Sequence, residues 1–176
     1  MDAFGVKFRI DREDLFPSLV AVFEALKQAK TVDNFGEQKD WAPRLHAEAR
    51  SRFIWPAEAE LEDRAAIRAT HPVRITEPSE AVGQQWPFDS VVAAIEDGEY
   101  NLLEITRTAS NTAELSIDPE AYPYGGVGAF IVLVEAHGMH VLGANEYGKY
   151  EPVSSGGLSA EAEGGVPKEP WWKFWR

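Results

Sequence analysis

The apolar residues near the start of the chain alternate with other residues and predict a strand. Over residues 4–10 the apolar side chains fall at every second position, which is the period of a strand with one buried face. Apolar residues then recur at helical spacing and predict a helix from about residue 14 to residue 30. Pro17 fits this helix only in its first turn, because proline has no backbone N–H to donate.

Residues 31–85 carry a weaker pattern, because charges are mixed and four prolines interrupt the sparse apolar residues. Two short helices are expected, near residues 43–52 and 57–69. In the second of them the acidic residues come early and the arginines late, an order that the helix dipole favours. Residues 73–75 are expected to form a short edge strand.

The pattern becomes clear again in the second half of the chain. Apolar residues at i, i+3, i+4 and i+7 predict an amphipathic helix over residues 88–95, with Gly98 as a left-handed C-terminal cap. Two alternating segments, residues 103–107 and 113–117, predict a β-hairpin with its turn near residues 109–111.

An aromatic, glycine-rich loop over residues 121–128 then leads into the most apolar segment of the chain. Residues 126–137 are expected to form a buried helix that ends at Gly138, and residues 139–147 are expected to form a last strand. The apolar run is too short to cross a bilayer, which needs roughly 20 apolar residues. The segment is therefore interpreted as the central helix of the core.

The order of these elements predicts an α+β fold, in which a mixed or antiparallel sheet carries helices mainly on one face. Residues 1–150 are expected to form a single domain, a length that supports its own core. The composition then shifts to Gly, Pro and Ser, which predicts a flexible tail over residues 151–176. The tail ends in the aromatic segment Trp171–Arg176, and exposed aromatic clusters usually dock on a surface.

The charge balance narrows the classes of partner. The chain has 29 acidic and 17 basic residues and a formal net charge of −12. This negative field disfavours binding to nucleic acid and stable association with anionic membranes, and it favours association with a basic protein. The sequence contains no cysteine, which excludes disulfides, thiolate nucleophiles and thiolate metal sites. A cytoplasmic location is expected, since no segment at the N-terminus resembles a leader.

The glycine cluster at the start of the apolar helix is the first candidate for chemistry. Gly125, Gly126 and Gly128 would let an anionic ligand approach free backbone amides at a helix N-terminus. Their spacing matches neither the dinucleotide fingerprint nor the P-loop. The alternative is structural, with small residues that allow close packing of Tyr122 and Tyr124.

A second candidate is the group Glu135, His137 and His140, which could act as an acid–base pair or as metal ligands. A structural zinc site usually draws four protein ligands, and the sequence shows no second cluster, so no metal and no other cofactor is expected. His137 is expected to cap the end of the helix as a cation. No Gly-x-Ser-x-Gly or Ser-x-x-Lys motif points to a nucleophile.

Two functional hypotheses follow from these observations. The first is a non-enzymatic protein-binding module that meets a basic protein partner, for example a bacterial immunity protein that neutralises a basic toxin. Aromatic residues are its expected contact anchors, because they dominate binding hot spots. These candidates are Trp41, Trp55, Trp86, Tyr122, Tyr124, Trp171, Trp172 and Trp175.

The second hypothesis is a small enzyme or small-ligand binder with a pocket at the loop over residues 122–128. Its polar groups would come from Glu135, His137 or His140, beside the three glycines of the loop. A third role, as a structural subunit, is expected if the terminal tryptophans join two copies of the chain in a homodimer.

Overall fold

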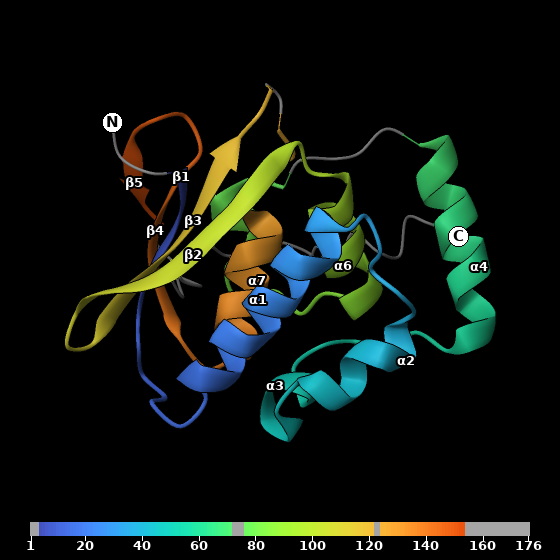
Figure 1. The fold of residues 1–176 in the computed structure, drawn as a ribbon, viewed down its shortest axis with the longest axis horizontal. Helices are drawn as coiled ribbons and strands as arrows, with labels where there is room; N and C mark the ends of the chain where they lie inside the picture. The colour runs from blue at the N-terminus through green and yellow to red at the C-terminus, as the bar shows by residue number, and fades with distance from the viewer. Residues whose placement is uncertain (1–3, 72–75, 122–123, 154–176) are drawn as a thin grey trace, which may run out of the picture.

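Five antiparallel strands form one sheet, and helices pack on one of its faces (Figure 1). The computed structural model describes residues 4–71, 76–121 and 124–153. The strands, in the sheet order β2-β3-β1-β4-β5, are β1 (Phe4–Arg9), β2 (Tyr100–Ala109), β3 (Thr112–Pro119), β4 (His140–Asn145) and β5 (Tyr150–Pro152). The helices are α1 (Phe16–Thr31), α2 (Gln38–Trp41), the 3-10 helix η1 (Ala42–Arg44), α3 (Ala47–Ser51), α4 (Glu58–Thr70), α5 (Pro78–Ala81), α6 (Phe88–Asp97) and α7 (Gly128–Ala136). The predicted α+β fold is confirmed, with the sheet antiparallel throughout.

The inner face of the sheet is built from alternating apolar side chains of its central strands. Val6 and Phe8 of β1 are fully buried, and they pair with Leu115 and Ala113 of β3. On the other side of β1, Phe8 pairs with Val141 of β4. Side chains in a strand alternate between the two faces of the sheet, so this register gathers the apolar set on one side. The strand predicted from the first ten residues is confirmed.

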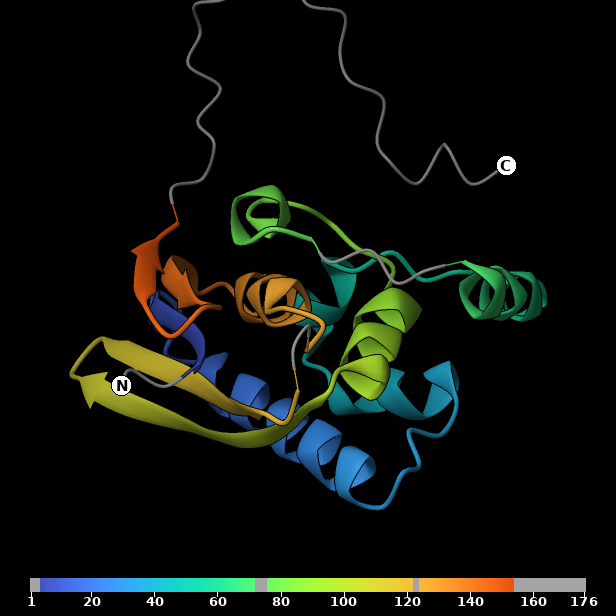
Figure 2. The same cartoon turned by 90° about the horizontal axis from the view of Figure 1, so that it is seen from above.

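The helix α7 is the most apolar element and lies in the middle of the helical layer. Every residue from Gly128 to Ala136 is buried except Glu135. The helix packs on β1 and β4, and α5 and α6 pack on it in turn. Figure 2 shows it between the sheet and α6. A helix that is apolar all round belongs in a core, and the predicted central helix is confirmed.

The first helix also agrees with the sequence pattern. α1 covers the β2 side of the sheet, with Pro17 in its first turn. The two short helices expected in the middle of the chain correspond to α3 and α4, whereas α2, η1 and α5 are additional short turns of helix. The edge strand expected at residues 73–75 lies outside the described residues.

The C-terminal end of α6 differs from its prediction. Gly98 has extended backbone, with φ −66° and ψ 133°, so the expected left-handed cap is wrong. A Cβ atom at this position would overlap the ring of Tyr100, which packs directly on the glycine. Lys30 of α1 satisfies the end of the helix instead, since its Nζ donates to Ile95 O at 2.8 Å and to Gly98 O at 2.7 Å. A third bond reaches Glu96 O at 3.1 Å.

The sheet extends two residues beyond the domain boundary predicted at residue 150, because β5 pairs with β4 as far as Pro152. The N–H of Val153 then donates to Leu142 O at 3.2 Å. Residues 154–176, with the terminal aromatic segment, lie outside the described residues. In the part of the chain that the structure describes, no helix is long and apolar enough to cross a membrane.

Candidate functional site

The four predicted contact anchors that the structure describes lie mainly inside the protein. Trp41, Trp86 and Tyr124 are only 3%, 7% and 3% exposed. Trp55 is half-buried and stacks on Phe88, with ring centroids 4.8 Å apart and an interplanar angle of 17°. These four side chains build the core and offer little surface to a partner in this structure.

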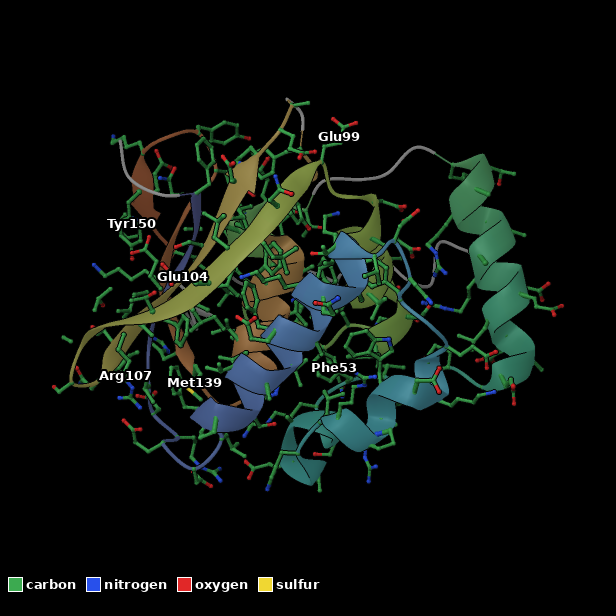
Figure 3. All side chains as sticks on the ribbon, viewed as in Figure 1. Phe53, Glu99, Glu104, Arg107, Met139 and Tyr150 are labelled. Carbon is green, nitrogen blue, oxygen red and sulfur yellow. The ribbon has the colours of Figure 1, made fainter. Side chains whose placement is uncertain are left out.

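Phe88 is the centre of this aromatic cluster. The rings of Trp41 and Phe53 approach it to centroid distances of 6.2 Å and 5.2 Å (Figure 3 labels Phe53). The indole N–H groups of Trp41 and Trp55 donate to backbone carbonyls at 2.7 Å and 2.8 Å, so both are satisfied within the chain. The other predicted anchors, Tyr122, Trp171, Trp172 and Trp175, lie outside the described residues.

The glycine loop before α7 is held by backbone conformation and by one tyrosine. Gly125 and Gly126 have φ values of 101° and 77°, in the region that favours glycine. The hydroxyl of Tyr124 donates to the backbone oxygen of Glu146 at 3.0 Å, which ties the loop to the end of β4. These two glycines therefore shape a turn that the tyrosine fixes to the sheet.

The N-terminus of α7 is closed by the protein's own groups. The N–H of Val127 donates to Glu146 Oε1 at 2.9 Å, and the Glu146 side chain is buried. A Cβ atom on Gly128 would lie 3.1 Å from Thr76 O and 3.5 Å from the ring of Trp86, so this glycine allows close packing. An internal carboxylate thus stands where an external anion would bind a helix N-terminus.

Burial raises the pKa of Glu146, although the hydrogen bond from Val127 acts in the opposite direction. The charge of Glu77 adds a smaller upward effect. Ionisation of Glu146 is therefore disfavoured by the fold, even at a helix N-terminus that attracts negative charge.

The structure separates the three polar residues at the end of α7. Glu135 Oε2 accepts a hydrogen bond from the N–H of Gly83 at 2.7 Å, and burial raises its pKa. His140 is exposed at the start of β4, near enough for its charge to act against that rise. His137 is fully buried and bonds back into its own helix. Glu135 and His140 thus share an environment, whereas His137 faces a different one.

The expected role of His137 as a cationic cap is wrong. Its Nδ1 lies 2.8 Å from Leu133 O, and a carbonyl oxygen only accepts, so Nδ1 carries the proton and donates. Its Nε2 is buried without a hydrogen-bond partner. Burial lowers the pKa of His137 to about 4, with smaller contributions from the charges of His46 and Arg52. The ring therefore caps a carbonyl near the helix end while neutral.

A group of exposed carboxylates surrounds the junction of α6 and β2, where Figure 3 labels Glu99. Hydrogen bonds join its two loops, since the N–H of Glu120 donates to Glu99 O at 2.9 Å. We name this surface the acidic rim, and its members are Asp33, Glu96, Asp97, Glu99 and Glu120. In the described part of the chain, none of the five forms an ion pair. Partial burial raises the pKa of Glu96, and the charges of Asp97 and Asp33 raise it further.

The charges of Arg68 and Lys30 both act on Glu96 of the acidic rim, but the donors of Lys30 are directed to backbone carbonyls. Its Nζ makes three hydrogen bonds to backbone carbonyls at the end of α6 and lies 5.1 Å from the ring centroid of Tyr100. Burial lowers its pKa, although carboxylates of the rim, with Glu120 and Asp97 foremost, act to raise it. The charge of Lys30 reaches the rim only through space.

Within the described residues, no group of three or more His, Asp or Glu side chains is arranged to hold a metal ion. The acidic rim follows no sequence motif, because its members come from the loop after α1, from α6 and from the two ends of the hairpin. Only the run Glu96-Asp97-Gly98-Glu99 gives a local signal for it. The hydrogen bond between Glu146 and Val127 could not be predicted from neighbouring residues either, since the two residues are 19 positions apart in the sequence.

Comparison of the chain with protein-family models, with curated proteins and with solved structures finds no match.

Proposed function

We propose that this chain is a non-enzymatic protein-binding module that engages a basic protein through the acidic rim. The observation that carries the proposal is the state of Lys30, whose donors are all directed to backbone carbonyls. Five exposed carboxylates around it are left without an ion pair in the described part of the chain. Basic side chains of a partner would supply the missing counter-charges.

Arginines neutralise acidic groups elsewhere on the surface. The carboxylates that pair with them in this way are Asp11, Glu13, Asp14, Glu48 and Asp89. The five neighbouring carboxylates of the rim have no such arginine partner among the described residues, and their combined charge would steer a basic protein to that surface. Steering of this kind acts on the association rate and weakens as salt is added.

The alternative, a ligand pocket at the loop before α7, receives less support. The amide of Val127 already donates to Glu146, and Gly128 is packed against Thr76 and Trp86. An immunity protein that neutralises a basic toxin is one concrete form of the proposed function. A captured partner with toxic activity, inhibited when this chain binds, would establish that form.

The test is a pull-down with the full chain from a lysate of the source cell, at low and at moderately high salt, followed by mass spectrometry. We expect one basic protein that is retained at low salt and weakened at high salt. Substitution of Glu96→Gln, Asp97→Asn and Glu99→Gln together should remove it. The matched control, Glu24→Gln, Glu104→Gln and Glu151→Gln, makes the same change in net charge at exposed positions outside the rim and should retain it.

Two outcomes would contradict the proposal. If no protein is retained at either salt concentration, the proposed binding function is wrong. Equal loss of the partner in the rim variant and in the control would show that net charge, rather than this surface, determines binding.

A further inference from the structure

The helix α4 stands apart from the body of the protein, at one side of the molecule in both views (Figures 1 and 2). None of its residues is buried, whereas α1, α6 and α7 each bury several apolar side chains. Its half-buried positions are Leu61, Arg64 and Ile67, which share one face. The helix is therefore held by partial apolar packing only, with no fully buried side chain.

An ion cluster joins α4 to the first turn of α6. Arg64 binds the carboxylate of Asp89 with two parallel hydrogen bonds, Nε to Oδ2 at 2.9 Å and Nη2 to Oδ1 at 3.0 Å. Arg68 donates from Nη1 to the same Oδ2 at 2.7 Å. The Nη2 of Arg64 also reaches the hydroxyl of Ser90 at 2.9 Å. We name this group of four residues the arginine clip.

The clip is more than an ordinary surface ion pair. The Asp89 side chain is only 8% exposed, so salt and water screen its contacts less than those of an open pair. The geometry at Arg64 is bidentate, which is the stronger arrangement of guanidinium and carboxylate. Two arginines one helical turn apart converge on one buried carboxylate, so the clip fixes α4 at a single point.

The rest of α4 supports a helix, and beyond the arginine clip its half-buried apolar residues are only Leu61 and Ile67. The segment is rich in good helix formers, and Glu60 accepts a hydrogen bond from the N–H of the N-cap residue Ala57 at 3.1 Å. A helix of 13 residues is nevertheless marginal in water without tertiary packing. The arginine clip thus decides whether α4 stays on the body.

We infer that α4 is a hinged arm, which opens from the body as a unit while the core stays folded, and that the arginine clip holds it closed. Opening would expose the carboxylate of Asp89 and shift the acidic first half of α4, residues 58–63, away from α6. The inference is independent of the proposed binding function, because it concerns the stability of one element.

Hydrogen exchange of the full chain, followed by mass spectrometry of peptides, tests the arm. In the unsubstituted protein the amides of α4 should exchange through local opening, well before those of α7. Asp89→Asn should speed exchange in α4 by about tenfold or more, because it removes charge-assisted bonds from both arginines. Exchange in α7 and β1 should not change. Arg9→Gln is the matched control, since it breaks the exposed pair with Asp11 and should leave α4 unchanged.

A second variant separates the clip from the effect of Asp89 on α6, where an acid in the first turn favours the helix. Arg64→Gln combined with Arg68→Gln keeps Asp89 in place and should release α4 to the same extent. The inference is overturned if α4 exchanges as slowly as α7, if neither variant changes exchange in α4, or if either accelerates α4 and α7 equally.

Discussion

His137 shows how a single buried ring can set the acid sensitivity of this protein. Its Nδ1–H is bonded to Leu133 O and its Nε2 is enclosed without a partner, so the folded state accommodates only the neutral ring. Protonation would place a cation in the core with no carboxylate bonded to it. The folded pKa of about 4 lies below the ordinary value of 6.5 for histidine.

We predict that His137 makes the free energy of unfolding fall as the pH drops from about 6.5 to about 4. In this window the unfolded chain binds a proton at His137 and the folded chain does not, so acid favours the unfolded state. The pKa difference corresponds to about 3 kcal/mol at the acid end. Urea denaturation of wild type and of His137→Phe across this range measures it as a difference in pH dependence.

The matched control is His140→Gln, which removes an exposed histidine next to the same turn. This variant should keep the acid sensitivity of the wild type, apart from a small change through Glu135. If the free energy of unfolding falls by the same amount with pH in wild type and in His137→Phe, the buried ring does not cause the loss of stability.

The contact between β4 and α7 determines how the glycine loop is built. Glu146 directly follows β4, and its buried carboxylate accepts a hydrogen bond from the N–H of Val127, the N-cap residue of α7. A helix N-terminus favours this charge, but burial has the larger effect and raises the pKa of Glu146. The folded state therefore favours the protonated form of the Glu146 side chain.

We predict that Glu146→Gln becomes more stable relative to wild type as the pH rises from 4 towards 7. The folded pKa of Glu146 is raised, so above the ordinary value of 4.5 the folded state holds a proton that the unfolded state has lost. Wild type therefore loses stability over this interval, and the neutral amide does not. Parallel urea titrations of the two proteins give the difference, which levels off once Glu146 is ionised in both states.

Glu151→Gln provides the comparison, because it neutralises an exposed glutamate on the neighbouring strand β5. Its stability relative to wild type should stay nearly constant over the same pH range. A constant difference for Glu146→Gln as well would contradict the assignment of the raised pKa to burial.

Periodicity predicted the regular elements because it records which side of each element is buried. The alternation at Val6 and Phe8 and the apolar run of α7 required no knowledge of their neighbours. Gly98 could not be interpreted in this way, since its role depends on the ring of Tyr100 and on a lysine that is 68 residues away. The strand β5 was also missed, because three residues are too few to show a period.

The candidate site was predicted less well than the fold, for a related reason. Tryptophans were expected at a contact surface, but a sequence with many aromatic residues does not say which of them fill the core. Trp41 lies against Phe88 of α6 and Trp86 lies beside Gly128 of α7, and only the tertiary structure brings these residues together. The acidic rim likewise depends on the meeting of helix and hairpin ends.

The whole molecule carries a net charge of −12, and the excess acts against its own compact state. We predict that 0.5 M NaCl raises the melting temperature at neutral pH by about 2–5 °C, because salt screens this repulsion. Thermal denaturation followed by circular dichroism measures the shift, and KCl should reproduce it, since screening does not depend on the identity of the ion. A lower melting temperature in both salts would show that ion pairs stabilise the molecule more than repulsion destabilises it.

The central position of β1 has a consequence for how the chain folds during synthesis. Phe8 pairs with Ala113 on one side and Val141 on the other, so its partners leave the ribosome more than 100 residues later. At 5–20 residues per second, β1 waits about 5–20 s for its first neighbour. Until then β1 lacks its strand partners, and the five-stranded sheet can close only after synthesis has passed β5. A nascent chain stalled before residue 112 should therefore be a strong substrate for chaperones.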